Sequence, residues 1–105
     1  MFRKATVLIL EISRVRILPG KEADFERIFY EAADILSTVK GFRGVELEKS
    51  IDKPGLYYMM VNWETLENHL VDFPGSPEAA LAMPLLLPLF DGMPEADHVV
   101  RIQRA

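Results

Sequence analysis

The sequence predicts an α+β domain of the ferredoxin-like type, with an antiparallel sheet and the element order βαββαβ. Two observations predict this class. Apolar residues alternate or fill both faces in four strand-like stretches, and they recur every three or four positions in the helical regions between them. These stretches follow one another as strand, helix, two strands, helical region and strand, which is the split βαβ arrangement. A chain of 105 residues corresponds to one domain, which we place at residues 1–105.

The first half of the chain predicts a strand, a helix and a strand. Residues 5–18 form a long strand with apolar side chains on both faces, and Pro19-Gly20 ends it. Residues 21–39 place apolar side chains at helical spacing and charged ones between them, which indicates an amphipathic helix. Residues 42–51 alternate apolar and charged positions again, as a half-buried strand does.

The second half predicts a hairpin partner, a helical region and a closing strand. Residues 56–64 form a strand that is apolar on both faces and pairs with the preceding one as a hairpin. A short helix is expected over residues 65–73, with Leu66, Leu70 and Phe73 directed inward. Residues 77–90 predict a second helical segment, broken or kinked by its two internal prolines. Residues 97–103 alternate as a last strand.

The segment 79–90 is apolar nearly all round. Such a segment is expected to be buried, to clamp a partner subunit, or to close over a ligand cavity. We favour packing against the sheet or a partner over a lid.

Both faces of the predicted sheet need a cover. The first and third strands are apolar on both sides, and the helices of one small domain cover only one of them. A monomer would therefore expose a large apolar face, which soluble proteins avoid. A second copy of the chain, packed sheet on sheet, is the expected cover, so we predict a homodimer through the sheet faces.

Composition narrows the partners and the chemistry. Lys and Arg number 12 against 16 Asp and Glu, which gives a net charge of −4 without a basic cluster, so no nucleic-acid partner is expected. The absence of cysteine excludes disulfides and thiolate catalysis, and two histidines do not suffice for a multi-histidine metal site in one chain. Glu11 interrupts the apolar run that a signal peptide would need, and the stretch 79–90 is too short to span a bilayer. We expect a cytoplasmic protein with no membrane partner.

Three residues in or near the third strand are candidates for a site. His69 could act as a base with a pKa near neutral, or be a helix residue with a local or solvent contact, which we favour. Asn62 interrupts an apolar face, so it is either satisfied by backbone or binds a carbonyl or phenolate oxygen. Trp63 is a core residue or an aromatic platform, and it points to the opposite face from Asn62.

Three further residues, Tyr58, Arg14 and His98, are candidates for substrate contacts. Tyr57 and Tyr58 are neighbours on a strand, so one is expected beneath the helices and the other at the dimer face. Arg14 lies towards the rim of the sheet, where it could hold an anionic substrate or belong to a solvated strand end. His98, on the last strand, points either into a pocket or to water.

Several segments share their order and spacing with a known family. The first strand ends in Leu18-Pro19-Gly20-Lys21, the following helix contains Phe25, and Gly41-Phe42 opens the second strand. The closest local match is Val61-Asn62-Trp63-Glu64-Thr65-Leu66-Glu67-Asn68-His69, a Trp-Glu pair followed by a histidine six residues after the tryptophan. Over residues 5–103 the chain resembles the antibiotic biosynthesis monooxygenase family.

The resemblance implies that two protomers pair sheet to sheet into a dimeric α/β barrel. It also implies a monooxygenase that oxidises an aromatic or quinol-type small molecule with O2, without metal or flavin. In that chemistry the substrate anion itself reduces oxygen, and the protein need only deprotonate, orient and shield it. On this basis Asn62 and His69 are predicted catalytic residues, and Trp63, Tyr58, Arg14 and His98 are predicted substrate contacts.

Two other functions stand beside this one. A non-catalytic dimeric module that binds a small ligand or supports an assembly is the alternative, since the sequence shows no evident acid–base pair. Haem-degrading relatives use an Asn in the first strand, a Trp in the second helix and a later His. At those places this chain has Ser13, Asp72 and Ala82, so haem degradation is disfavoured.

Overall fold

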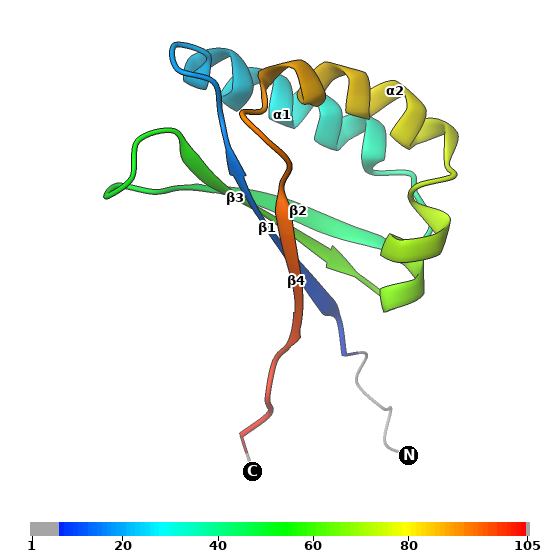
Figure 1. The fold of residues 1–105 in the computed structure, drawn as a ribbon. Coiled ribbons are helices and arrows are strands. Elements are labelled where there is room, and N and C mark those ends of the chain that lie inside the picture. The colour runs from blue at the N-terminus through cyan, green and yellow to red at the C-terminus, as the bar shows by residue number, and fades with distance from the viewer. Residues whose placement is uncertain (1–6, 105) are drawn as a thin grey trace, which may run out of the picture.

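The computed structural model describes residues 7–104 and confirms the predicted ferredoxin-like α+β fold. Four antiparallel strands form one sheet in the order β2-β3-β1-β4, and the helices α1 and α2 lie side by side over one of its faces (Figure 1). The elements are β1 (Ile9–Arg16), α1 (Glu22–Leu36), β2 (Phe42–Lys49), β3 (Leu56–Trp63), η1 (Asn68–Asp72), α2 (Pro77–Leu86), η2 (Leu87–Leu89) and β4 (Glu95–Val100). Residues 5 and 6 of the predicted first strand lie outside the described residues.

The last strand is shifted relative to its prediction. It begins at Glu95 rather than 97 and ends at Val100 rather than 103. The pairing with β1 explains the shift, because the first residue of β1, Ile9, lies opposite Val100. Residues 101–103 therefore continue beyond the paired part of the sheet.

The short second helix differs more strongly from its prediction. The chain is helical over residues 66–72, and within this stretch Asn68–Asp72 form the wide turns of a π-helix. Leu66 and Leu70, expected to face inward, are 43% and 54% exposed, so that part of the prediction is wrong. The wide turn instead directs His69 and Phe73 against the ring of Trp63.

The apolar segment 79–90 forms α2 and the short 3-10 helix η2. Pro84 lies inside α2, and the change of helix type occurs at Leu87, next to Pro88. One side of α2 is buried against α1, but Leu81 on its outer side is 65% exposed. Within this chain the segment therefore packs on its inner side only, and clamping a partner subunit or closing over the cavity stay predictions for its outer side.

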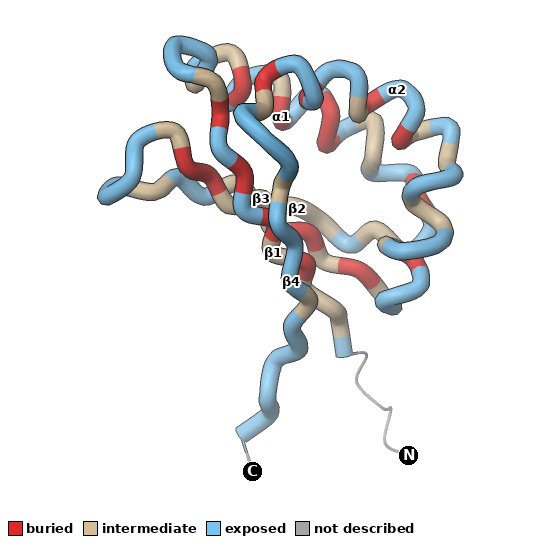
Figure 2. The backbone as a smooth tube through the Cα atoms, in the orientation of Figure 1, coloured by how far each residue is buried: buried red, intermediate tan, exposed pale blue. Residues whose placement is uncertain are grey.

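The main core lies between the helices and the sheet, where the buried positions of β1, β3 and the two helices face one another (Figure 2). Phe25 and Tyr57 are fully buried at its centre, with ring centroids 4.9 Å apart. The hydroxyl of Tyr57 donates to the carboxylate of Glu26 on α1, which fastens this helix to β3. Burial and the Glu26 carboxylate both raise the pKa of Tyr57, so its phenol stays neutral and keeps donating.

The other face of the sheet, which we call the open face, has no helix over it in the described chain (Figure 1). The register places Tyr58 beside Arg14, Met60 beside Ile12, and Asn62 beside Leu10 on this face. Strand neighbours point to opposite sides, so Tyr57 and Tyr58 divide between the core and the open face as predicted.

Candidate functional site

A glutamate lies beneath the helices on the inner face of the sheet. Glu11 and Ser13 occupy the same face of β1 as the core residues Val15 and Ile17, and both are buried, at 9% and 4% exposure. Buried carboxylates are rare unless other groups hydrogen-bond or pair with them. The surroundings of Glu11 therefore define the candidate site.

Three polar groups surround the Glu11 carboxylate. The hydroxyl of Ser13 donates to Oε2 at 2.7 Å, and the indole N–H of Trp63 donates to Oε1 at 3.0 Å. Nε2 of His69 lies 3.3 Å from Oε1. These groups come from β1, β3 and η1, so three separate elements hold one carboxylate in place.

A second histidine extends this cluster to the edge of the sheet. Nδ1 of His69 lies 2.7 Å from Nε2 of His98, a residue that the β1–β4 register places directly opposite Glu11. If His69 carries its hydrogen on Nε2, that hydrogen lies on the side of the carboxylate, which can only accept. Nδ1 of His69 is then an acceptor, and His98 donates to it through Nε2–H.

The pKa of His69 lies below its ordinary value. Burial lowers its pKa, and His98 lowers it further, while the nearby Glu11 charge acts in the opposite direction. Its ring stacks on the indole of Trp63, with centroids 5.5 Å apart and planes 13° from parallel. His69 is thus fixed by a stacked ring on one side and by polar partners at both nitrogens.

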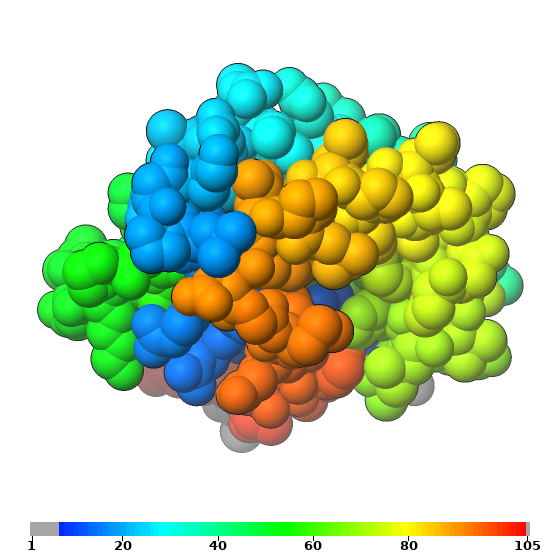
Figure 3. Space-filling view, turned by 45° about the horizontal axis from the view of Figure 1, so that its top comes forward, coloured from blue at the N-terminus to red at the C-terminus, as the bar shows by residue number. Residues whose placement is uncertain are grey.

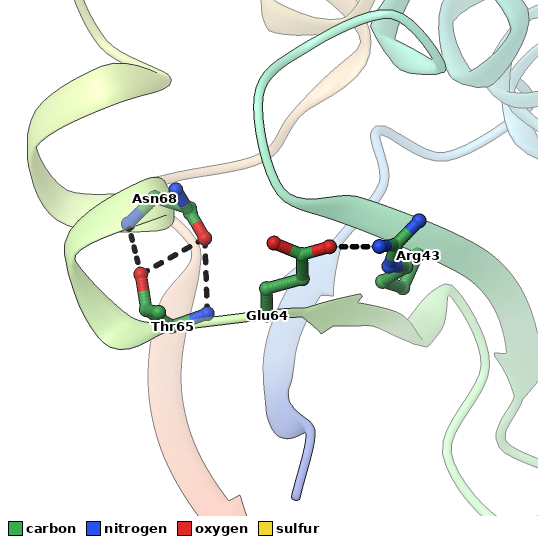
Figure 4. A network of polar contacts seen from close by, with 4 residues as sticks. All are labelled: Arg43, Glu64, Thr65 and Asn68. Carbon is green, nitrogen blue, oxygen red and sulfur yellow. Dashed lines mark hydrogen bonds and ion pairs between the residues drawn. The ribbon is translucent and has the colours of Figure 1, made fainter. Parts of the chain in front are cut away.

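The turn that positions His69 is stabilised by the polar contacts shown in Figure 4. The backbone N–H and the hydroxyl of Thr65 both donate to Oδ1 of Asn68, at 3.0 and 2.9 Å, and the Asn68 N–H returns a bond to Thr65 Oγ1 at 3.1 Å. Arg43 pairs with Glu64 and joins the adjacent ends of β2 and β3. Gly41 has a φ of +81°, and a side chain there would overlap Asn68, so only glycine fits beside this turn.

A cavity of about 180 Å³ lies next to the cluster, between the sheet and the two helices. Its mouth is visible in Figure 3 as a hollow between α2, η1 and the segment before β4, with atoms of β1 at the bottom. Within the described part of the chain, Glu11, Ser13, His69 and the indole N–H of Trp63 bring polar groups to its wall. The remaining surface is apolar and includes the rings of Phe29, Phe42, Trp63, Phe73 and Phe90 and the methionines Met59 and Met83.

The structure brings together only half of the predicted site residues. His69, Trp63 and His98 meet at Glu11. Asn62, Tyr58 and Arg14 lie on the open face, separated from the cavity by the sheet itself. Asn62 there lines a different hollow, which it shares with Leu8, Leu10 and Val99 among others. Asn62 and His69, predicted to act together, therefore do not share a site within one chain.

Glu11 and Ser13 were missed as site residues. The alternation of the strand could have indicated them. They are the two polar residues on a strand face that otherwise carries apolar residues at positions 7, 9, 15 and 17. The sequence alone assigned no carboxylate to orient His69, and Glu11 occupies that position.

Metal-binding clusters and membrane-spanning helices are both absent from residues 7–104. Within that range no group of three or more His, Asp or Glu side chains is arranged to hold a metal ion. No helix in it is long and apolar enough to cross a membrane.

Comparison with known proteins gives this arrangement a family. The model of the antibiotic biosynthesis monooxygenase family matches residues 8–83, which include β1, Trp63 and His69. The chain belongs to this family. A relative, the uncharacterized protein YczJ of Bacillus subtilis (strain 168), is 34% identical over 91 residues, covering 87% of this chain and 96% of the relative.

Solved structures of family members share the fold. A Bordetella bronchiseptica protein that carries the family name is 34% identical and has a TM-score of 0.88, covering 92% of this chain and 99% of its own. SnoaB, a cofactor-independent oxygenase from Streptomyces nogalater, was solved as a mutant and has a TM-score of 0.69 at 19% identity, covering 96% of each chain. At that identity SnoaB supports the shared fold alone.

Proposed function

We propose that this member of the antibiotic biosynthesis monooxygenase family is a cofactor-independent monooxygenase. Its substrate is an aromatic or quinol-type small molecule, bound in the cavity beneath α1 and α2 and oxidised with O2. The observation that carries the proposal is the Glu11 carboxylate at the wall of an otherwise apolar cavity, held by Ser13, Trp63 and His69. Family membership and the described activity of SnoaB support the same reaction class.

The chemistry requires one proton acceptor and a dry, shaped space. A phenol loses the proton of its hydroxyl group, and the resulting phenolate passes one electron to O2. The phenoxyl radical and superoxide combine at a ring carbon to a peroxide, which takes back the proton, loses water and leaves a quinone. One phenol and one O2 molecule thus give one quinone and one water molecule. The substrate supplies all the electrons, and the protein contributes deprotonation, orientation and shielding.

Glu11 is the proton acceptor in this proposal. A carboxylate offers about four acceptor positions, and three of them face Ser13, Trp63 and His69, which leaves one on Oε2. In the tautomer with its hydrogen on Nε2, neutral His69 has no free lone pair, because Nδ1 then accepts from His98. His69, predicted from the sequence as a base, is here a positioning residue.

The alternative, a non-catalytic binding module, would be favoured by an interior packed solid with side chains. The cavity and its carboxylate favour the enzyme instead.

Oxygen uptake tests the proposal directly. Wild-type protein should accelerate O2 consumption with at least one member of a panel of quinols and anthrones of one to three rings. Glu11→Gln should abolish most of this acceleration, whereas Glu31→Gln, an exposed carboxylate on α1, should leave it unchanged. If no member of the panel reacts faster with wild-type protein than in buffer, the module becomes the better account.

We also propose that two copies pair through the open face. Leu8, Leu10, Ile12 and Met60 lie on that face with no helix over them in the described chain. Light scattering after size-exclusion chromatography should give about twice the chain mass of 11.9 kDa. Ile12→Glu should shift the mass to that of one chain. Leu81→Glu, an equivalent change on the exposed side of α2, should not; a single-chain mass for the wild type would contradict the pairing.

A further inference from the structure

We infer that the cavity selects a neutral phenol of one or two rings, which it recognises through a single donated hydrogen bond. The inference rests on the proposed function of this cavity and narrows its substrate class. Three properties of the described wall lead to it: its charge, its hydrogen-bonding groups and its volume.

Charge selects against anionic ligands. Among the described residues that line the cavity, Glu11 is the one acidic side chain, and none is Lys or Arg. A carboxylate, sulfonate or phosphate in this apolar space would face Glu11 without a compensating cation, and such a charge is costly to bury unpaired. Arg14, predicted from the sequence as a holder for an anionic substrate, lies on the open face and cannot supply that cation.

Hydrogen bonding selects a donor. The polar side-chain hydrogens of the described wall are all directed at Glu11. The Ser13 hydroxyl and the Trp63 N–H donate to it, and the His69 N–H faces the same carboxylate. A ligand that only accepts, such as a quinone or an ether, finds no donor there. A ligand hydroxyl can donate to the remaining acceptor position on Oε2 of Glu11.

The same hydrogen-bonding requirement distinguishes the substrate from the product. Oxygenation of a phenol to a quinone and water removes the O–H that Glu11 recognises and leaves a carbonyl, which only accepts. Losing a hydrogen bond to a charged group typically weakens binding by at least about tenfold. The product is therefore held less tightly than the substrate, and this favours its release.

Volume limits the number of rings. The cavity measures about 180 Å³, whereas pockets for drug-sized ligands usually span roughly 300–1,000 Å³. The walls are formed by packed side chains of both helices and the sheet, among them Phe29, Met59 and Met83. One or two fused rings suit this space better than three.

Calorimetry under anaerobic conditions tests the class without turnover. The probes are 2-naphthol, its methyl ether, 6-hydroxy-2-naphthoate and 2-hydroxyanthracene, which change the donor, the charge and the ring number one at a time. We expect 2-naphthol to bind most tightly and each of the others at least about tenfold more weakly. Glu11→Gln should erase the preference for 2-naphthol over its ether, and Glu31→Gln should preserve it.

The outcomes separate this inference from the proposed reaction. Equal or tighter binding of the ether, the naphthoate or the three-ring phenol overturns the inference, and so does the absence of binding by all four. The expected order of affinities together with no O2 uptake would uphold the ligand class and refute the monooxygenase. Turnover of a three-ring anthrone without binding of 2-naphthol would do the reverse.

Discussion

Replacing Glu11 with glutamine removes the acidic group from the cavity wall while keeping the side-chain shape. A positioned general base typically contributes about 10²–10⁴ in rate. At about 1.4 kcal/mol for each tenfold step, the loss corresponds to roughly 3–5 kcal/mol of transition-state stabilisation. The glutamine oxygen can still accept from Trp63, and the Ser13 hydroxyl can turn to accept from the new amide, so the variant should fold.

The stability cost follows from the same contacts. Hydrogen bonds to a charged group contribute about 1.5–3 kcal/mol and those to a neutral one about 0.5–1.5 kcal/mol, while the buried charge no longer has to be desolvated. We expect a net loss of about 1–2 kcal/mol, which lowers Tm by roughly 5–15 °C. A thermal melt followed by circular dichroism measures this, and oxygen-electrode rates below the melting range measure kcat/KM. If the folded Glu11→Gln variant keeps more than about a tenth of the wild-type kcat/KM, Glu11 is not the base.

Three further substitutions probe the surroundings of the site. Burial lowers the pKa of His69, so the free energy of unfolding of the wild type should fall as pH drops below about 6.5, the histidine pKa of the unfolded chain. Urea unfolding at pH 7.5, 6.5 and 5.5 should show a weaker fall for His69→Gln. Gly41→Ala should destabilise the fold by about 1–3 kcal/mol more than Gly20→Ala, because both glycines have positive φ but only the first would overlap Asn68; equal losses in urea would contradict the crowding. Tyr57→Phe removes the hydrogen bond to α1 and should cost about 1 kcal/mol by urea unfolding while leaving kcat/KM unchanged, since Tyr57 does not line the cavity.

The fold was predictable because its signals are local. The change of period after Gly20 and the return to alternation at Phe42 mark α1 and β2 closely. The π-helix η1 could not be found in this way, since one wide turn held by Thr65 and Asn68 leaves no repeat in the sequence. Its prediction as an ordinary helix therefore placed Leu66 on the wrong side.

The site was less predictable because its residues meet through long-range pairing. His69 and His98 could be named from the sequence, but their contact depends on the register between β1 and β4. Glu11 could be assigned to the inner face by alternation, but a single acidic residue in an apolar run does not indicate that a cavity lies next to it. Asn62 is the opposite case. It was predicted as a catalytic group because it is polar in an apolar strand, but the alternation of the strand places it on the open face, away from the cavity.

The position of Trp63 gives this protein a built-in optical probe. It is the single tryptophan of the chain, so all indole emission comes from one point on the cavity wall. Its ring touches His69, its N–H is bound to Glu11, and it is 2% exposed. Protonation of the histidine, entry of an aromatic molecule and loss of the fold would each alter the surroundings of the same indole. One emission spectrum can therefore follow titration, occupancy and unfolding in the unmodified protein.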